Sequence, residues 1–144
     1  MGVRIDFYHD AADKLAVAAK IAQKAQAAGQ RVLVVAPDAA VRESFDRVLW
    51  TFAPLAFVPH VRAGHRLEPE TPVILSDRIA DIAGGKPSVL VNLGNETPAG
   101  FEAYERLIEV VSRDEDDKAP ARLRFRSYRE AGHEITSHRL GERT

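Results

Sequence analysis

Two spacings of apolar residues alternate along the chain of 144 residues. Runs in which nearly every residue is apolar, such as Arg31–Pro37 (RVLVVAP), are typical of strands that are buried on both faces of a sheet. Between these runs lie stretches in which apolar residues recur every three or four positions, which is typical of amphipathic helices. Strands that alternate with helices predict an α/β fold, with a largely parallel twisted sheet flanked by helices, in a single domain, 1–144.

In the first half of the chain the pattern predicts two helices, and along the whole chain it predicts four strands with mainly apolar residues. The strands are predicted at Val3–His9, Arg31–Pro37, Val73–Asp77 and Val89–Gly94. The first helix is predicted within residues 11–29, with Asp10 as its N-cap and Gly29 as its stop. The second helix follows Asp38, which caps it. Its apolar stripe consists of Val41, Phe45, Val48, Leu49 and Phe52.

A third helix is predicted to begin at Thr97–Pro98. Its apolar face consists of Phe101, Tyr104, Leu107, Ile108 and Val111. Residues 53–72 are predicted to form a long loop with one short strand at Phe57–Val58. Residues 130–140 (EAGHEITSHRL) receive no assigned element.

The composition limits the compartment and the chemistry. The chain has no cysteine, which excludes disulfides, thiol nucleophiles and thiolate metal sites and fits a reducing cytoplasm. The longest apolar runs cover a few residues, far fewer than the ~20 that a membrane-spanning helix requires. Acidic residues follow the N-terminus too closely for the apolar segment of a signal peptide. We therefore expect a cytoplasmic protein without a membrane segment.

The charges of the chain are unevenly distributed. The formal net charge is −1, yet residues 118–129 contain five basic residues and no acidic one, while residues 114–117 (DEDD) are all acidic. A nearly neutral protein with one basic stretch suits a small acidic target better than a long phosphate backbone.

The chain lacks the residues that known types of nucleotide-binding site require. The turn after the first predicted strand has no glycine to let the backbone approach a pyrophosphate, and its Asp10 and Asp13 would repel phosphate. Gly84–Lys86 lacks the spacing of a P-loop. The fold is therefore predicted to resemble nucleotide-binding folds without a functional nucleotide site, and we expect no catalytic residue, cofactor or metal.

The histidines do not form a recognisable metal or catalytic pattern. His60 and His65 are five positions apart, as are His133 and His138, and neither pair has the i, i+4 spacing of helical metal ligands. We interpret them as surface histidines. His9–Asp10, at the end of the first strand, is interpreted as a capping pair rather than as an acid–base pair.

The basic stretch Arg122–Arg129 (RLRFRSYR) is predicted to be helical. Helical spacing places four side chains on one face: Arg122, Phe125, Arg126 and Arg129. Leu123 and Tyr128, on two other rows, are expected to turn toward the core. The acidic run before the arginines has the polarity that a helix dipole favours. The basic face is either solvated and paired with nearby acids, or it offers guanidinium groups to an external carboxylate.

Large apolar side chains also gather in residues 48–60 (VLWTFAPLAFVPH). One interpretation is that these rings cover an edge of the core. The other is a docking patch for a second protein, because aromatic residues anchor many interfaces.

Two motif blocks resemble the chi subunit of the bacterial DNA polymerase III holoenzyme. They are LWTFAPLAFVPH followed by Ala63–Gly64, and YREAG at Tyr128–Gly132, and they occur in the same order as in that family. The chain length, the order of strands and helices and the early FYH are also similar, so the resemblance covers nearly the whole chain.

The resemblance implies a non-enzymatic accessory protein of the clamp-loader complex with two partners. One is the psi subunit, and the other is the acidic C-terminal tail of single-stranded DNA-binding protein, which ends in a phenylalanine with a free carboxylate. Carried over by position, the psi-facing patch would centre on Trp50 and Phe57. The acidic-tail site would consist of Val111, Lys118, Arg122, Phe125 and Arg126.

Two departures from the family bear on the tail site. Phe125 stands where the family often has tyrosine, so a hydroxyl contact is lost. Pro120 falls in the region that the family makes helical and is expected to be tolerated only in the first turn, which bears on the position of Lys118. The alternative function is direct binding of single-stranded nucleic acid by the basic and aromatic side chains.

Overall fold

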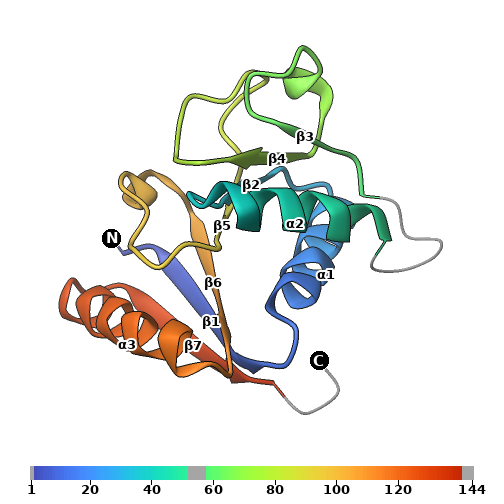
Figure 1. Cartoon of the computed structure of the whole chain (residues 1–144). Coiled ribbons are helices and arrows are strands. Elements are labelled where there is room, and N and C mark those ends of the chain that lie inside the picture. Colours follow the sequence, from blue (N-terminus) through green and yellow to red (C-terminus); the bar gives the residue numbers. More distant parts are fainter. Residues whose placement is uncertain (1, 52–57, 141–144) are drawn as a thin grey trace.

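A single sheet of seven strands organises the chain (Figure 1). The computed structural model describes residues 2–51 and 58–140. The strands are β1 (Arg4–Ala11), β2 (Val32–Val35), β3 (His60–Arg62), β4 (Val73–Ser76), β5 (Val89–Asn92), β6 (Arg106–Ser112) and β7 (Glu134–Arg139). Their order in the sheet is β3-β4-β2-β5-β6-β1-β7, and every neighbouring pair is parallel. The predicted α/β class with a largely parallel sheet is confirmed.

Helices cover both faces of this sheet. They are α1 (Lys14–Ala27), α2 (Ala39–Thr51) and α3 (Glu115–Glu130), with short 3-10 turns η1 (Glu68–Glu70) and η2 (Phe101–Ala103). Alternate residues of β2 show the two layers, because Val32 and Val34 pack in the cluster under α1 and α2, whereas Leu33 and Val35 pack in the cluster that includes α3 and η2. Figure 1 shows α3 (orange) beside β7, apart from α1 and α2.

The first two helices agree with the prediction except at one cap, and Phe52, predicted in the apolar stripe of the second helix, lies outside the described residues. Gly29, with a φ of 82°, follows the end of α1, and the Asp38 carboxylate accepts a hydrogen bond of 2.8 Å from the amide of Ala40 at the start of α2. The N-cap of α1 is Asp13, whose side chain accepts from the amide of Ala16 at 3.1 Å. The prediction of Asp10 as this cap is wrong, because β1 continues past that residue.

The predicted third helix is wrong. Thr97–Pro98 lead into η2 and then into β6, whose five residues from 107 to 111 are all buried. The apolar residues of that stretch satisfy a helical spacing, but they also form a nearly continuous run, which is how a strand between two others reads. Flanked by β5 and β1, β6 needs apolar side chains toward both helical layers.

Two shorter elements also differ from the prediction. The strand expected at Phe57–Val58 is found instead at His60–Arg62, and Phe57 lies outside the described residues. Glu134–Arg139, which received no assignment, forms the edge strand β7 beside β1.

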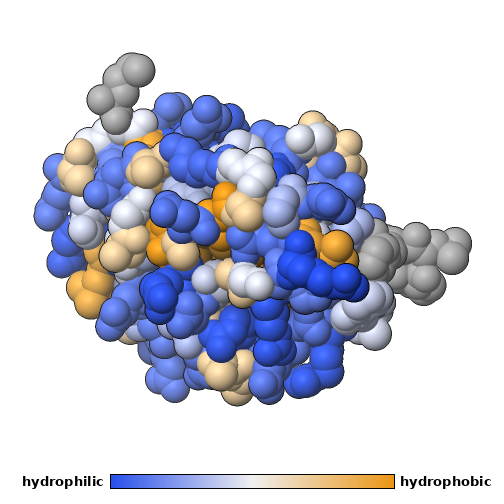
Figure 2. Space-filling model, turned by 90° about the horizontal axis from the view of Figure 1, so that it is seen from above, coloured by the Kyte–Doolittle hydropathy of each residue, from blue (hydrophilic) through white to orange (hydrophobic). Residues whose placement is uncertain are grey.

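One face of the molecule is predominantly polar. When the molecule of Figure 1 is seen from above, hydrophobic residues occur in small, separate groups among hydrophilic ones (Figure 2). Within the described ranges, no helix is both long enough and apolar enough to cross a membrane.

Candidate functional site

A pocket of about 490 Å³ lies between α3 and the ends of β1, β6 and β7. The strands contribute both apolar and polar side chains, and four of the six residues from the helix are basic. The lining consists of Phe7, His9, Asp10, Val111, Lys118, Ala121, Arg122, Phe125, Arg126, Arg129 and Ser137. We call this the basic pocket.

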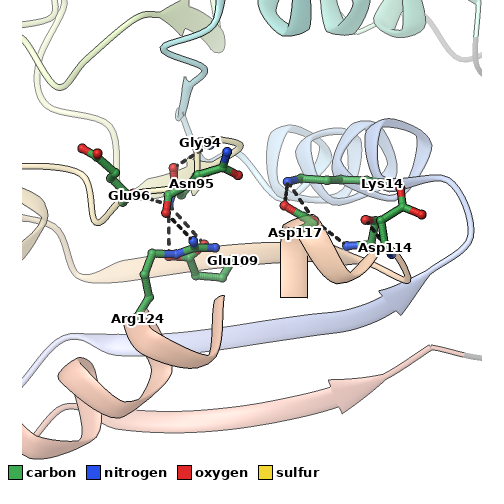
Figure 3. Close-up of polar contacts among 10 residues, drawn as sticks. Lys14, Gly94, Asn95, Glu96, Glu109, Asp114, Asp117 and Arg124 are labelled. Atoms are coloured by element: carbon green, nitrogen blue, oxygen red, sulfur yellow. Dashed lines mark hydrogen bonds and ion pairs between the residues drawn. The ribbon is translucent and has the colours of Figure 1, made fainter. Parts of the chain in front are cut away.

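The inner side of α3 is held to the sheet by a buried ionic network (Figure 3). Glu109 of β6 is fully buried, and two nitrogens of the Arg124 guanidinium donate to its two carboxylate oxygens at 3.1 Å. The third guanidinium nitrogen donates to the carbonyl oxygen of Asn95 at 2.8 Å. The hydroxyl of Tyr128 donates to Glu109 at 2.7 Å, and burial together with this carboxylate raises the pKa of Tyr128. The network sets which face of α3 is turned outward.

A second contact anchors the first turn of α3 (Figure 3). The carboxylate of Asp117 accepts from the ammonium of Lys14 at 2.9 Å and from the backbone amide of Ser112 at 2.7 Å. Burial alone would raise the pKa of Asp117, but these donors outweigh it and lower the pKa below the ordinary value. The start of α3 is therefore tied to α1 as well as to the end of β6.

The opposite face of α3 forms one wall of the basic pocket. The ring of Phe125 meets the ring of Phe7 edge-on with 5.3 Å between centroids, and the guanidinium of Arg129 lies over the Phe125 ring at 5.9 Å. Arg122 is paired with Glu115 at 2.6 Å, which lowers the pKa of Glu115. In the part of the chain that the structure describes, the exposed guanidinium of Arg126 has neither an ion pair nor a hydrogen bond.

Asp10 reaches the basic pocket through an irregularity in β1. Tyr8 is in register with Val110 and Ala11 with Ser112, so three steps along β1 match two along β6, which is a β-bulge. Asp10 has a φ of 62°, a left-handed conformation that aspartate tolerates better than most residues. Its carboxylate lies 2.9 Å from the ammonium of Lys118.

The five predicted tail-site residues all line this one pocket. They come from β6 and α3 and are Val111, Lys118, Arg122, Phe125 and Arg126. The sequence reading missed the contribution of β1 and β7. Phe7 and Ser137 could not be placed because their strand neighbours were unknown, whereas His9–Asp10 was noticed and assigned to capping instead.

A family model for the DNA polymerase III chi subunit, HolC, matches residues 3–136. The chain belongs to the chi subunit family. Three bacterial proteins named DNA polymerase III subunit chi are similar to this chain.

The Pseudomonas aeruginosa protein is 35% identical over 141 residues, covering 95% of this chain and 96% of the relative. The Haemophilus influenzae and Escherichia coli proteins are 26% and 25% identical over 125 and 118 residues, covering 87% and 82% of this chain and 86% and 80% of their own lengths. The resemblance seen in the two motif blocks is confirmed.

The chi-family helix α3 is regular in spite of Pro120. The expectation that this proline is tolerated only in the first turn is wrong, because the helix begins at Glu115 and Pro120 is its sixth residue. The amide that Pro120 lacks would have bonded to the carbonyl of Asp116, an exposed residue. Leu123 is 64% exposed, so its expected turn toward the core is also wrong.

The aromatic patch is visible in part. Trp50, at the end of α2, is 57% exposed and contacts the ring of His60 with 5.1 Å between centroids. Phe57, the other predicted centre of the psi-facing patch, lies outside the described residues. Of the two predicted centres of the patch, the structure therefore describes Trp50.

The interpretation of the histidines as surface residues is wrong for one of them and incomplete for two others. The His60 side chain is 1% exposed, with its Nε2 3.1 Å from a carboxylate oxygen of Asp46. His138 lies 2.9 Å from the buried carboxylate of Asp6, and His133 accepts a hydrogen bond from the amide of Val3 at 2.9 Å. These side chains join strands and loops to one another.

An acidic crevice of about 1140 Å³ lies near the start of α3, at the carboxyl ends of the strands. Seven acidic side chains and one lysine line it. They are Asp13, Asp38, Glu96, Asp114, Glu115, Asp116 and Asp117, with Lys14. Sheets of this kind bind nucleotides at this edge, and such a lining repels phosphate groups. Across residues 2–51 and 58–140, no group of three or more histidine, aspartate or glutamate side chains is arranged to hold a metal ion.

Proposed function

We propose that this chi-family chain is a non-catalytic accessory subunit of the DNA polymerase III clamp-loader complex with two protein partners. It binds the acidic C-terminal tail of single-stranded DNA-binding protein, and it binds the psi subunit. In this role it links the replicase to coated single-stranded DNA and contacts DNA only indirectly.

The observation that carries the tail-binding part is the pairing of an apolar floor with a cationic wall in the basic pocket. Phe7, Val111 and Phe125 offer an apolar surface to a terminal phenylalanine ring. Arg126, beside them, offers a planar guanidinium that suits two-point binding of a carboxylate. A peptide that ends in phenylalanine presents both groups on one residue, so a single terminal residue can occupy floor and wall together.

The remaining cations favour the acidic residues before the terminal one. Lys118 and Arg122 lie along the same wall, about one helical turn apart. Their charges can attract aspartates upstream of the phenylalanine. A short flexible tail loses conformational freedom when it binds, so we expect a dissociation constant on the order of micromolar that rises with salt.

Isothermal titration calorimetry with a peptide that ends in Asp-Asp-Ile-Pro-Phe tests this function. The free-acid peptide is expected to bind, and the same peptide with an amidated C-terminus is expected to bind at least about tenfold more weakly, because the charge-assisted contact is lost. Equal affinity for the two peptides would show that no terminal carboxylate is recognised in the basic pocket.

The psi-binding part rests on the exposure of Trp50 at the end of α2. A large exposed ring suits an interface anchor, because burial of tryptophan contributes strongly to many interfaces. Co-purification of the full chain with a psi subunit is the test, with Trp50→Ala expected to lose the complex and Leu123→Ala, on α3, expected to keep it. Retention of the complex by Trp50→Ala would remove this residue from the interface.

A further inference from the structure

We propose that Asp10 is an internal counter-ion that competes with the ligand carboxylates for Lys118, and thereby limits both the affinity and the anion selectivity of the basic pocket. The inference rests on the tail binding proposed above. It adds a residue of β1 that weakens binding to the cationic residues of α3 that promote it.

The fold places Asp10 in the pocket by a specific backbone device. Phe7 packs in the layer that contains α3, whereas Tyr8 and Ala11 both pack in the layer under α1, although they are an odd number of positions apart. The bulge between Tyr8 and Ala11 causes this change of parity. In a regular strand Asp10 would share the face of Tyr8, and with the bulge it lines the pocket together with Phe7.

Three basic side chains surround the carboxylate of Asp10. It lies 2.9 Å from the ammonium of Lys118, 2.7 Å from Nδ1 of His9 and 3.8 Å from the guanidinium of Arg139. The hydrogen bond from Lys118, followed by that from His9, lowers the pKa of Asp10 to about 2, so the carboxylate is charged at neutral pH. The ammonium of Lys118 therefore has a partner before any ligand arrives.

The internal pairing of these cations determines which chemical groups a ligand needs in order to bind. Arg122 is likewise paired, with Glu115, so within the described part of the chain Arg126 and Arg129 are the pocket arginines without an ion pair or hydrogen bond. Arg129 already lies over the ring of Phe125, which leaves the Arg126 guanidinium to receive an external carboxylate. An incoming acid must displace Asp10 from Lys118 or bind beside its negative charge, and both routes weaken binding. Anions without an apolar anchor gain little, which favours a phenylalanine carboxylate over a nucleic-acid phosphate.

Asp10→Asn is the variant that separates charge from backbone conformation. Asparagine adopts the left-handed conformation at least as readily as aspartate, so the bulge is expected to persist. The matched control is Asp116→Asn, which removes the same charge from an exposed position of α3 that lines the acidic crevice and not the basic pocket.

Calorimetry with the free-acid peptide is expected to show Asp10→Asn binding about three- to tenfold more tightly than the wild type, with Asp116→Asn within about twofold of it. Fluorescence anisotropy with a labelled single-stranded oligonucleotide is expected to show a gain for Asp10→Asn as well. In a Lys118→Ala background the effect of Asp10→Asn is expected to shrink, because the two residues act as a pair.

Each outcome decides between the two proposals. If the wild type binds the peptide and Asp10→Asn binds equally or more weakly, Asp10 only positions Lys118 and the counter-ion inference fails while tail binding stands. An undiminished effect of Asp10→Asn in the Lys118→Ala background would also overturn the inference. Long-range repulsion between the Asp10 charge and the acidic peptide, independent of Lys118, would then explain the effect. If Asp10→Asn binds and the wild type does not, the counter-ion inference holds and native tail binding fails. If neither binds, both proposals fail.

Discussion

Arg124 and Arg126 stand two positions apart on α3 and have opposite environments. The Arg124 guanidinium is almost fully buried and makes a two-point contact with Glu109 of β6. The Arg126 guanidinium is exposed at the mouth of the basic pocket. Residues two apart on a helix point in directions roughly 200° from each other, so one side of the helix meets the sheet while the other meets solvent.

The difference shows that a run of arginines on one helix can serve two separate purposes. Removing the inner arginine leaves a buried carboxylate without its cation, whereas removing the outer one leaves a gap at the surface. Stability is therefore expected to depend on the inner face and ligand affinity on the outer face. Four variants test that division.

Arg124→Ala is expected to have the largest effect, a loss of about 3–5 kcal/mol in the free energy of unfolding, because Glu109 would remain buried and uncompensated. Urea denaturation followed by circular dichroism measures it. Arg126→Ala, the same truncation on the outer face, is the control and should stay close to the wild type. Equal losses for the two variants would contradict the division of α3 into two faces.

Asp117→Asn is expected to cost roughly 2 kcal/mol at neutral pH, because the contacts with Lys14 and the Ser112 amide favour the charged carboxylate. The folded-state pKa of Asp117 lies below its ordinary value of 3.8, so this contribution is present above about pH 4 and is lost as the pH falls further.

Urea denaturation from about pH 5 to about pH 2 should therefore show the wild type and Asp117→Asn converging in stability at the acidic end. Asp116→Asn, a neighbouring exposed carboxylate, serves as the control and should track the wild type throughout. A constant gap between Asp117→Asn and the wild type at every pH would mean that the ionised carboxylate is not what stabilises this end of α3.

Arg126→Ala is expected to reduce the affinity for the free-acid peptide about tenfold while leaving the unfolding midpoint unchanged. The reason is that the Arg126 guanidinium has no ion pair within the described residues that the free protein would lose. Calorimetry and thermal unfolding of the same sample measure the two quantities. Arg126→Lys should recover part of the affinity, since it restores the charge without the planar fork. An unchanged affinity in Arg126→Ala would place the ligand carboxylate elsewhere.

Glu115→Gln is expected to have the smallest effect. The pair between Glu115 and Arg122 is exposed to solvent, so its loss should not change the unfolding midpoint measurably. Peptide affinity should rise by less than it does in Asp10→Asn, because an exposed acid competes more weakly than one held inside the pocket. A clear fall in stability would mean that this surface pair contributes more than solvent screening allows.

The sequence predicted most of the fold, and its errors have identifiable causes. β2, β4 and β5 were recognised because each is a short apolar run, and α1 and α2 because their apolar residues recur at helical spacing. Residues 106–112 also form a short apolar run, but their spacing fits a helix equally well, and Thr97–Pro98 resembles a helix start. Only the two neighbouring strands decide that this segment is β6.

The α3 part of the candidate site was predictable from helical spacing and Val111 of β6 from the family resemblance, whereas the contributions of β1 and β7 were missed. Helical spacing alone placed Arg122, Phe125 and Arg126 on one face, and the structure confirms that arrangement. The roles of Arg124 and Asp10 depend on partners 15 and 108 positions away along the chain, namely Glu109 and Lys118, and on one extra residue in β1. No local pattern reports such contacts.

The position of β1 in the sheet has a consequence for the order in which the protein can form. Arg4 is in register with Arg106 on one side and with Glu134 on the other, so β1, which is made before the other strands of this sheet, pairs only with the two strands that are made last. Contacts this distant in sequence slow folding, because the long intervening chain must first be confined. The strands β2 to β5 can assemble earlier, whereas the basic pocket, built from β1, β6, α3 and β7, can exist only after β7, the last strand of this sheet, has been translated.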